Sequence, residues 1–134
     1  MRALGIIKIS LFYVAITAVA LAALAPPAGA FRKGRDFAAW VGLTPSQHST
    51  GGKQKLGMTS KMGERTLRRL LIIGASSVVR KAVRQGTAAG SWLGRMLARK
   101  PRMLVIVALA NKLARIAWAV QAKGEVYRAP AVVA

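Results

Sequence analysis

Few residues of this chain could carry out acid–base or metal chemistry. Its 134 residues include three carboxylates, Asp36, Glu64 and Glu125, which stand far apart in the sequence. Two-metal phosphoryl transfer needs several converging carboxylates, and glycosidases need a close pair, so neither site is predicted. A Ser-His-Asp relay would have to use His48, the one histidine, with Asp36, and we do not expect one. The lack of cysteine excludes disulfides, thiolate nucleophiles and cysteine-based zinc sites.

A short hydroxyl- and glycine-containing segment offers more chemistry. Ser49-Thr50-Gly51-Gly52 is followed closely by Lys53 and Lys55. A hydroxyl beside glycines can approach a phosphate closely, and nearby backbone N–H and ammonium groups can stabilise charge that develops there. The same residue types are common in ordinary turns. The residues alone therefore leave a catalytic loop and a plain turn as alternatives.

The charge of the chain is strongly unbalanced. It has 22 Lys and Arg against 3 Asp and Glu, a formal net charge of +19, while 54% of its residues are hydrophobic. That hydrophobic content is too high for a disordered basic tail. The charge predicts a polyanionic partner, either nucleic acid or an anionic membrane surface, with an unpartnered solvated surface as the alternative. Trp40, Trp92 and Trp118 could stack on bases, although such tryptophans are more often part of a core.

Residues 1–30 differ from the rest and predict one apolar, alanine-rich helix. Arg2 and Lys8 are their only charges, and the apolar stretch ends at Pro26-Pro27. The pattern fits a secretory signal peptide. It also fits a marginal membrane anchor, because Ile9–Ala25 has 17 residues, at the lower limit for a span. The third interpretation is a helix buried in a soluble protein.

Apolar periodicity predicts four further helices. They are expected over Asp36–Gly42, Glu64–Arg84, Ser91–Arg99 and Met103–Lys123. The start of the second is uncertain, because Ser60 could cap it but Glu64 does not stand at the capping-box spacing. The last is apolar nearly all round, which predicts burial.

The expected fold is therefore all-α. A small helical domain occupies residues 31–123, with a loose tail over 124–134. Thr44–Lys61 is the main irregular segment, a Gly/Ser-rich loop with a short hairpin around Gly51-Gly52 as the alternative. Basic residues in and after this segment are the candidates to hold a phosphate backbone. They are Lys53, Lys55, Lys61, Arg65, Arg68 and Arg69.

Phe31–Arg80 resembles a known family. Its motifs are DFAAWVGLTP at Asp36–Pro45, QHSTGGK at Gln47–Lys53, LGMTSKMGER at Leu56–Arg65 and LRRLLIIGA at Leu67–Ala75. In order and spacing they are similar to the C-terminal domain of insertion-sequence transposases of the 116/110/902 group, whose relatives include the Piv-type DNA invertases. The similarity begins as early as residues 16–27 and continues through residues 90–118.

The resemblance implies a mechanism. Members combine an N-terminal RuvC-like domain, whose four acidic residues bind a divalent metal such as Mg²⁺, with a C-terminal domain that supplies a nucleophilic serine. They cut and rejoin DNA through a covalent protein–DNA intermediate, act as oligomers, and in some cases use a guide RNA. Their serine-glycine motif falls here on Ser49-Thr50-Gly51-Gly52. Many members have serine directly before the first glycine, where this chain has Thr50. We expect Ser49 to be the nucleophile, because a primary hydroxyl is less hindered, with Thr50 as the alternative.

The acidic domain that the family implies does not match any part of this sequence. Asp36, Glu64 and Glu125 cannot replace its carboxylates, and Met1–Ala15 does not match the family's preceding hairpin. We therefore expect a truncated or frameshifted copy that carries no cofactor of its own, binds DNA and is inactive alone.

The resemblance also favours particular partners and a compartment. The expected partners are DNA, an intact transposase and, where one is used, a guide RNA, with no membrane, in the cytoplasm. If Ile16–Pro27 belongs to the transposase domain, its apolar residues serve packing rather than targeting. Two other functions stay open: a non-catalytic nucleic-acid-binding remnant and a secreted cationic protein.

Overall fold

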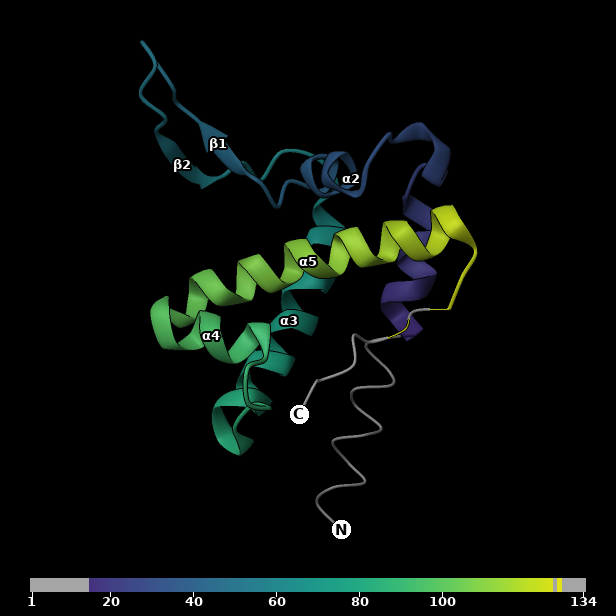
Figure 1. Ribbon diagram of the computed structural model, residues 1–134. Helices are drawn as coiled ribbons and strands as arrows, with labels where there is room; N and C mark the ends of the chain where they lie inside the picture. The colour runs from purple at the N-terminus through teal and green to yellow at the C-terminus, as the bar shows by residue number, and fades with distance from the viewer. Residues whose placement is uncertain (1–14, 127, 129–134) are drawn as a thin grey trace.

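The computed structural model describes residues 15–126 and residue 128 (Figure 1). Predictions for residues 1–14 and for most of the tail over 124–134 lie outside the described residues. In chain order the elements are a helix at Ala15–Leu24, the 3-10 helix η1 (Ala28–Ala30), α2 (Gly34–Val41), β1 (Pro45–Gln47), β2 (Leu56–Thr59), α3 (Arg65–Gln85), α4 (Trp92–Arg99) and α5 (Arg102–Lys123). The fold is mostly helical, as expected. It is not all-α, because β1 and β2 form a two-stranded antiparallel sheet within Thr44–Lys61.

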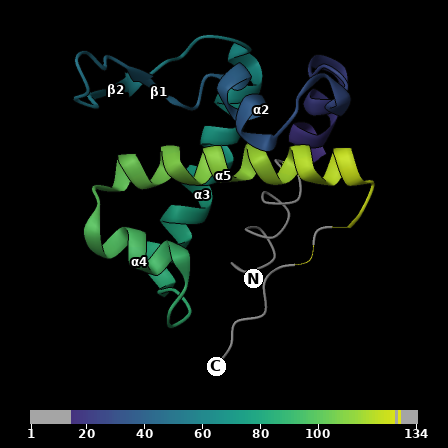
Figure 2. The same ribbon diagram turned by 45° about the horizontal axis from the view of Figure 1, so that its top comes forward.

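The core forms where α5 crosses α3. Figures 1 and 2 both show α5 lying across α3, with α2 on one side and α4 on the other. Apolar residues at three- and four-residue steps give each helix one face that packs into this crossing. The buried side chains of α3 are Leu67, Leu71, Ala75 and Val79, and those of α5 are Val105, Ile106, Leu109, Ala110 and Ala114. Phe37, Ala38 and Val41 of α2 complete the core together with Leu21 and Leu43.

The packing of α5 accounts for its apolar sequence. It contacts η1, α2, α3 and α4, and five of its residues are buried, whereas Met103 and Leu104 are exposed, so the expected burial is confirmed only in part. By length and composition alone, its 22 residues would also be sufficient to cross a membrane. Trp118 of α5 is half-buried, and its Nε1 donates a hydrogen bond to the carbonyl of Ala28 at 3.1 Å. Trp40 and Trp92 also pack against the core, which favours packing over base stacking for all three tryptophans.

The helix Ala15–Leu24 is less buried than expected. Leu21 reaches the core, whereas Ile16, Val19 and Leu24 are exposed, with Val19 at 69%. The expectation that Ile16–Pro27 serves packing therefore holds at Leu21, with Ala20 and Ala25 packed against the core, and stays a prediction for the exposed positions. Apolar composition alone could not reveal this, because an alanine-rich helix has the same sequence pattern whether or not a neighbour covers it.

Two of the three carboxylates cap helices. The Glu64 carboxylate accepts a hydrogen bond from the Thr66 N–H at 2.9 Å, so α3 begins at Arg65 and Ser60 is not its cap. The Asp36 carboxylate accepts from the Lys33 N–H at 3.1 Å at the start of α2. A side chain that accepts from free N–H groups of a first turn stabilises that helix end. Both acids are thus explained by local structure.

Two glycines bring the end of α2 against the segment that leads into α3. Gly42 ends α2 with φ of 82°, and Gly63 has φ of 97°. A Cβ on Gly42 would overlap the carbonyl oxygen of Met62, and one on Gly63 would overlap that of Trp40. Only glycine combines this close approach with a left-handed backbone. The hairpin therefore leaves and re-enters the helical body at one fixed point.

Candidate functional site

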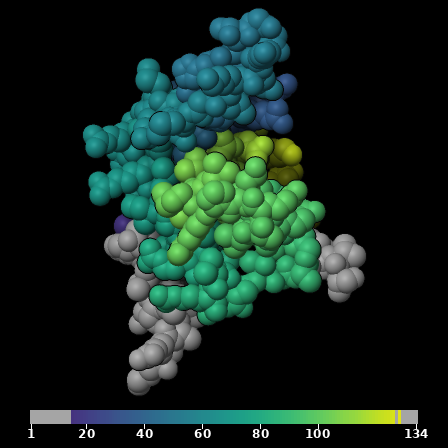
Figure 3. Space-filling view, turned by 90° about the vertical axis from the view of Figure 1, so that its left-hand side faces the viewer, coloured from purple at the N-terminus to yellow at the C-terminus, as the bar shows by residue number. Residues whose placement is uncertain are grey.

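The hydroxyl segment forms the tip of the β1–β2 hairpin. Thr50 pairs with Lys53, whose N–H donates to the Thr50 carbonyl at 3.2 Å, so Gly51 and Gly52 form a two-residue turn. Their φ values of 58° and 79° are both left-handed, as a type I′ hairpin turn requires. The short hairpin, which the sequence offered as an alternative to a loop, is therefore present. Figure 1 shows it projecting from the helices, and Figure 3 shows it at the top of the molecule.

The pairing register sorts the hairpin side chains into two faces. One register runs from the pair Gln47–Leu56, through the hydrogen bond of the His48 N–H to the Lys55 carbonyl at 2.9 Å, to the pair Thr50–Lys53. Successive residues of a paired strand point to opposite faces. One face therefore carries His48, Thr50, Lys53 and Lys55, and the other carries Gln47, Ser49, Gln54 and Leu56.

This division separates the two candidate hydroxyls. By this alternation we expect Thr50 to share its face with Lys53 and Lys55, and Ser49 to lie on the opposite face with Gln54. All five residues are exposed and can reach a ligand. The pairing register thus associates the two lysines with Thr50 rather than with Ser49, a distinction that spacing along the sequence did not provide.

A β-bulge fixes this register below the tip. Between two of the β1–β2 pairs, Ser46 stands opposite two residues, Gly57 and Met58. The Ser46 hydroxyl donates to the Met58 carbonyl at 3.0 Å, and its oxygen lies 3.4 Å from Nε2 of His48. A Cβ on Gly57 would lie 2.7 Å from the Ser46 oxygen, so glycine leaves room for this cluster. The histidine therefore takes part in holding the hairpin, at a feature that often re-aims side chains beside active sites.

Three of the predicted phosphate contacts surround the base of the hairpin. Lys61 precedes α3, and Arg65 and Arg69 lie on its first two turns, all with exposed side chains. Lys61 has φ of 53° and is the non-glycine residue with a left-handed backbone in the part of the chain that the structure describes. A lysine in this conformation is uncommon, and the Lys61 N–H donates to the Gly42 carbonyl at 3.3 Å.

Arg68 differs from the other predicted contacts. It is half-buried, and its Nη1 donates to the Val41 carbonyl at 2.9 Å and lies 3.4 Å from the Met62 carbonyl. The guanidinium thus links the last residue of α2 to the segment that leads into α3. From the sequence, Arg68 was predicted to contact DNA. In the structure, its hydrogen bonds hold the end of α2 against the segment before α3. A DNA contact by Arg68 stays a prediction.

Metal-binding groups are not gathered at the hairpin. Within residues 15–126 and 128, no three His, Asp or Glu side chains form a group that could hold a metal ion. Asp36 and Glu64 cap helices, and Glu125 follows the end of α5.

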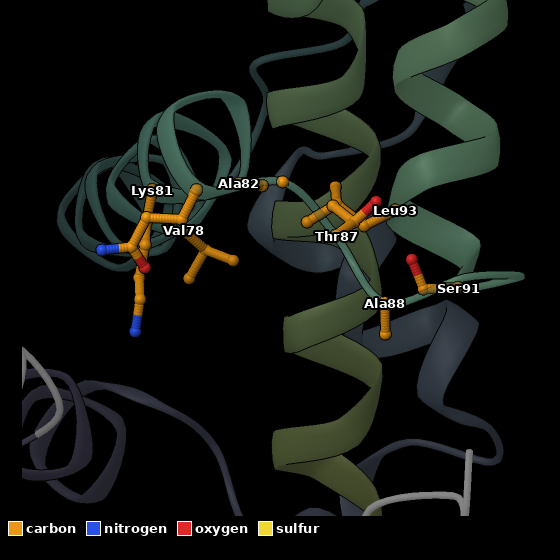
Figure 4. Close-up of a pocket in the computed structure, with 9 residues that line it drawn as sticks. Val78, Lys81, Ala82, Thr87, Ala88, Ser91 and Leu93 are labelled. Carbon is orange, nitrogen blue, oxygen red and sulfur yellow. The ribbon is translucent and has the colours of Figure 1, made fainter. Parts of the chain in front are cut away.

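A hollow of about 290 Å³ lies elsewhere, between the end of α3 and the start of α4 (Figure 4). Figure 4 shows Val78 and Lys81 on one side and Leu93 on the other. Val78 on this side is 47% exposed. The Ser91 hydroxyl at its rim accepts from the Gly94 N–H as the cap of α4. Because neither histidine nor carboxylate is among the described residues that line the hollow, the hairpin is the better candidate site.

Comparison with known proteins agrees with the motifs of the hairpin and α3. The family described as Transposase IS116/IS110/IS902 matches residues 14–89. A probable family 20 transposase of Pseudomonas aeruginosa is 53% identical over 113 residues, which are 84% of this chain and 33% of that relative. A putative transposase, y4pF/y4sB, of Sinorhizobium fredii is 53% identical over 100 residues, 73% of this chain and 26% of the relative. The transposase for insertion sequence element IS1328 of Yersinia enterocolitica is 42% identical over 112 residues, 84% of this chain and 34% of the relative. The chain thus spans about a third or less of the length of these curated relatives.

Proposed function

Because the chain belongs to the IS116/IS110/IS902 transposase family, we propose that it acts in DNA transposition, where it binds DNA and supplies a hydroxyl nucleophile for strand cleavage and rejoining. The proposal rests on the projecting hairpin. Its tip presents Ser49-Thr50 at a Gly-Gly turn, and exposed cations stand on the hairpin and at its base. This combination offers both a nucleophile and contacts for a phosphate backbone.

In the proposed step the hydroxyl attacks a phosphorus atom of DNA. An O–P bond to the protein forms and the P–O bond to one deoxyribose oxygen breaks. The attacking hydroxyl loses its proton to water, and the released deoxyribose oxygen takes up a proton from water. The protein then holds one strand end as a phosphodiester, and the other end carries a free hydroxyl. Attack by the hydroxyl of a different strand end reverses the step and rejoins DNA without any loss of phosphodiester bonds.

Ser49 is our proposed nucleophile and Thr50 its alternative. The primary hydroxyl of Ser49 is the less hindered of the two. Thr50 has the advantage of Lys53 and Lys55 on its own face of the hairpin. Variants of the two hydroxyls therefore have to be compared in the same assay.

We propose that this chain does not cleave DNA by itself. Its described residues contain no carboxylate cluster, and a divalent metal such as Mg²⁺, when bound, would neutralise charge on the reacting phosphate. The carboxylates would come from another segment or from an intact transposase with which the chain assembles, in the cytoplasm. A guide RNA, as some members use, stays a prediction.

The experiment supplies the chain together with the acidic domain of a relative, Mg²⁺ and DNA of an insertion-sequence end. Cleavage is expected only when both proteins are present, and Ser49→Ala should abolish it. If the unmodified chain binds this DNA but never yields cleaved strands, the function is that of a nucleic-acid-binding remnant. Recovery of a chain processed near Ala30 from a secreted fraction would instead favour the secreted cationic protein.

A further inference from the structure

Four arginines share one face of α3. Arg69, Arg80 and Arg84 lie about 40°, 60° and 100° around the helix from Arg65, at 3.6 residues per turn. The buried residues of α3 are centred on the opposite side of the helix. All four arginines are exposed. We call them the arginine stripe.

The surroundings of the arginine stripe contain no opposing charge from its own helix. α3 has no acidic residue between Arg65 and Gln85. Between the two arginine pairs, the hydroxyls of Ser76 and Ser77 donate to the Ile72 and Ile73 carbonyls one turn earlier, at 2.8 and 3.1 Å. The hydroxyls are thus satisfied within the helix, and the guanidinium groups dominate the charge of this face.

The spacing within the stripe is unfavourable for an isolated helix. Arg65 and Arg69 are four residues apart, as are Arg80 and Arg84, and like charges at this spacing destabilise a helix. Arg68 lies on a different side of α3, and its guanidinium donates hydrogen bonds to the Val41 and Met62 carbonyls. A polyanion along the stripe would relieve the repulsion that the four outward arginines create.

The length of the stripe fits a stiff polyanion. Arg65 and Arg84 are separated by about 28 Å along the helix, at 1.5 Å per residue. A DNA duplex covers that distance in about eight base pairs, at 3.4 Å per step. A rigid helix presents two arginine pairs about 22 Å apart at fixed positions. A duplex, whose phosphates are held on a stiff surface, matches this arrangement better than a flexible single strand.

We propose that the arginine stripe binds the phosphate backbone of double-stranded DNA, as a surface that begins with Arg65 and Arg69 at the base of the hairpin and continues along α3. Arg80 and Arg84 then extend the DNA contact from the hairpin base to the far end of α3. The inference rests on the DNA partner of the proposed function and is independent of the nucleophile. No sequence preference is expected from it, because phosphate contacts position a duplex without reading its bases.

The test is the salt dependence of duplex binding by the full chain. The variant Arg80→Gln/Arg84→Gln is compared with the unmodified chain by fluorescence anisotropy, with a duplex of mixed sequence, between 50 and 200 mM salt. Loss of two phosphate contacts should reduce the slope of log K against log salt by about 1.8. Arg80→Lys/Arg84→Lys should keep the slope, because lysine also neutralises a phosphate. Circular dichroism checks that each variant folds.

The matched control removes the same charge elsewhere. Lys123→Gln/Arg128→Gln alters two exposed cations at and after the end of α5, and the slope should stay as in the unmodified chain. Equal losses in the two double variants would show a general charge effect and overturn the proposal. No change in the Arg80/Arg84 variant would overturn it as well.

Two further arms separate other ligands. The variants are also titrated with a single strand and with vesicles that contain phosphatidylserine. If the Arg80/Arg84 variant weakens binding to either of these and leaves duplex binding unchanged, the stripe does not bind a duplex. Lys53→Gln/Lys55→Gln is measured in parallel. If Lys53→Gln/Lys55→Gln alone weakens duplex binding, the stripe proposal is overturned and the hairpin proposal stands. If the Arg80/Arg84 variant loses duplex binding but no cleavage is observed, the stripe proposal stands and the proposed nucleophile is overturned.

Discussion

The Arg68 guanidinium donates a hydrogen bond from Nη1 to the Val41 carbonyl at 2.9 Å, across 27 residues of sequence. The contact joins the first turn of α3 to the last turn of α2. The hairpin leaves α2 at Gly42 and returns at Gly63, so Arg68 fixes the two points between which the hairpin stands. The position of the candidate nucleophile thus depends on an arginine that the sequence assigned to DNA.

Replacement of Arg68 by methionine tests this role. Arg68→Met keeps a long side chain but leaves the Val41 carbonyl without its donor, so the free energy of unfolding should fall by about 1–3 kcal/mol. Chemical denaturation measures the loss. Arg69→Met, at the neighbouring exposed position, is the control and should change stability by no more than about 0.5 kcal/mol. Equal effects of the two substitutions would remove the structural role from Arg68.

Gly63 provides a second test of the junction. Gly63→Ala places a Cβ against the Trp40 carbonyl on a left-handed backbone, so we expect a loss of about 2 kcal/mol or more. The control is Gly74→Ala, in the interior of α3, where a Cβ meets nothing within 4 Å. Alanine should stabilise that helix by up to about 1 kcal/mol. The melting temperature should therefore fall for Gly63→Ala and rise for Gly74→Ala. A shift of both melting temperatures in the same direction would contradict this expectation.

Two substitutions of Lys61 distinguish the effect of its left-handed backbone on stability from the effect of its side chain on DNA binding. Lys61→Gly relieves the left-handed conformation, so stability should stay the same or rise by up to about 1 kcal/mol, while DNA binding should weaken. Lys61→Gln keeps the backbone constraint and should weaken binding equally. Melting temperature and anisotropy are measured on the same preparations. Unchanged DNA binding by Lys61→Gly would show that the lysine does not contact DNA.

The long helices could be predicted closely from the sequence. Glu64–Arg84 and Met103–Lys123 each match a helix within one residue at either end, because apolar spacing is a local property. The start of α3 needed the structure, since Ser60 and Glu64 both have capping side chains and only the Glu64 carboxylate meets an N–H group. Which residues of Ala15–Leu24 are buried and which are exposed could not be predicted, because this depends on the neighbours that the helix contacts.

The candidate site was only partly visible in the sequence. The Gly-Gly pair indicated the turn, and the motif indicated the hydroxyls. The separation of Ser49 from Lys53 and Lys55 depends on the pairing register, which the bulge opposite Ser46 sets. Ser46 and Gly57 were not expected to matter. The sequence signal for Ser46 was its spacing of two residues from His48, which places both side chains on one face of a strand.

We propose above all that a hydroxyl of Ser49-Thr50 becomes covalently joined to DNA. The direct measurement is mass spectrometry of digests after the chain, the acidic domain of a relative and Mg²⁺ act on a nicked substrate that traps the intermediate. We predict a nucleotide-linked peptide from the hairpin, with the nucleotide on Ser49, which Ser49→Ala eliminates and Thr50→Ala retains; the opposite pattern would assign the role to Thr50. An adduct that maps outside the hairpin, or that persists when both hydroxyls are removed, would contradict the account.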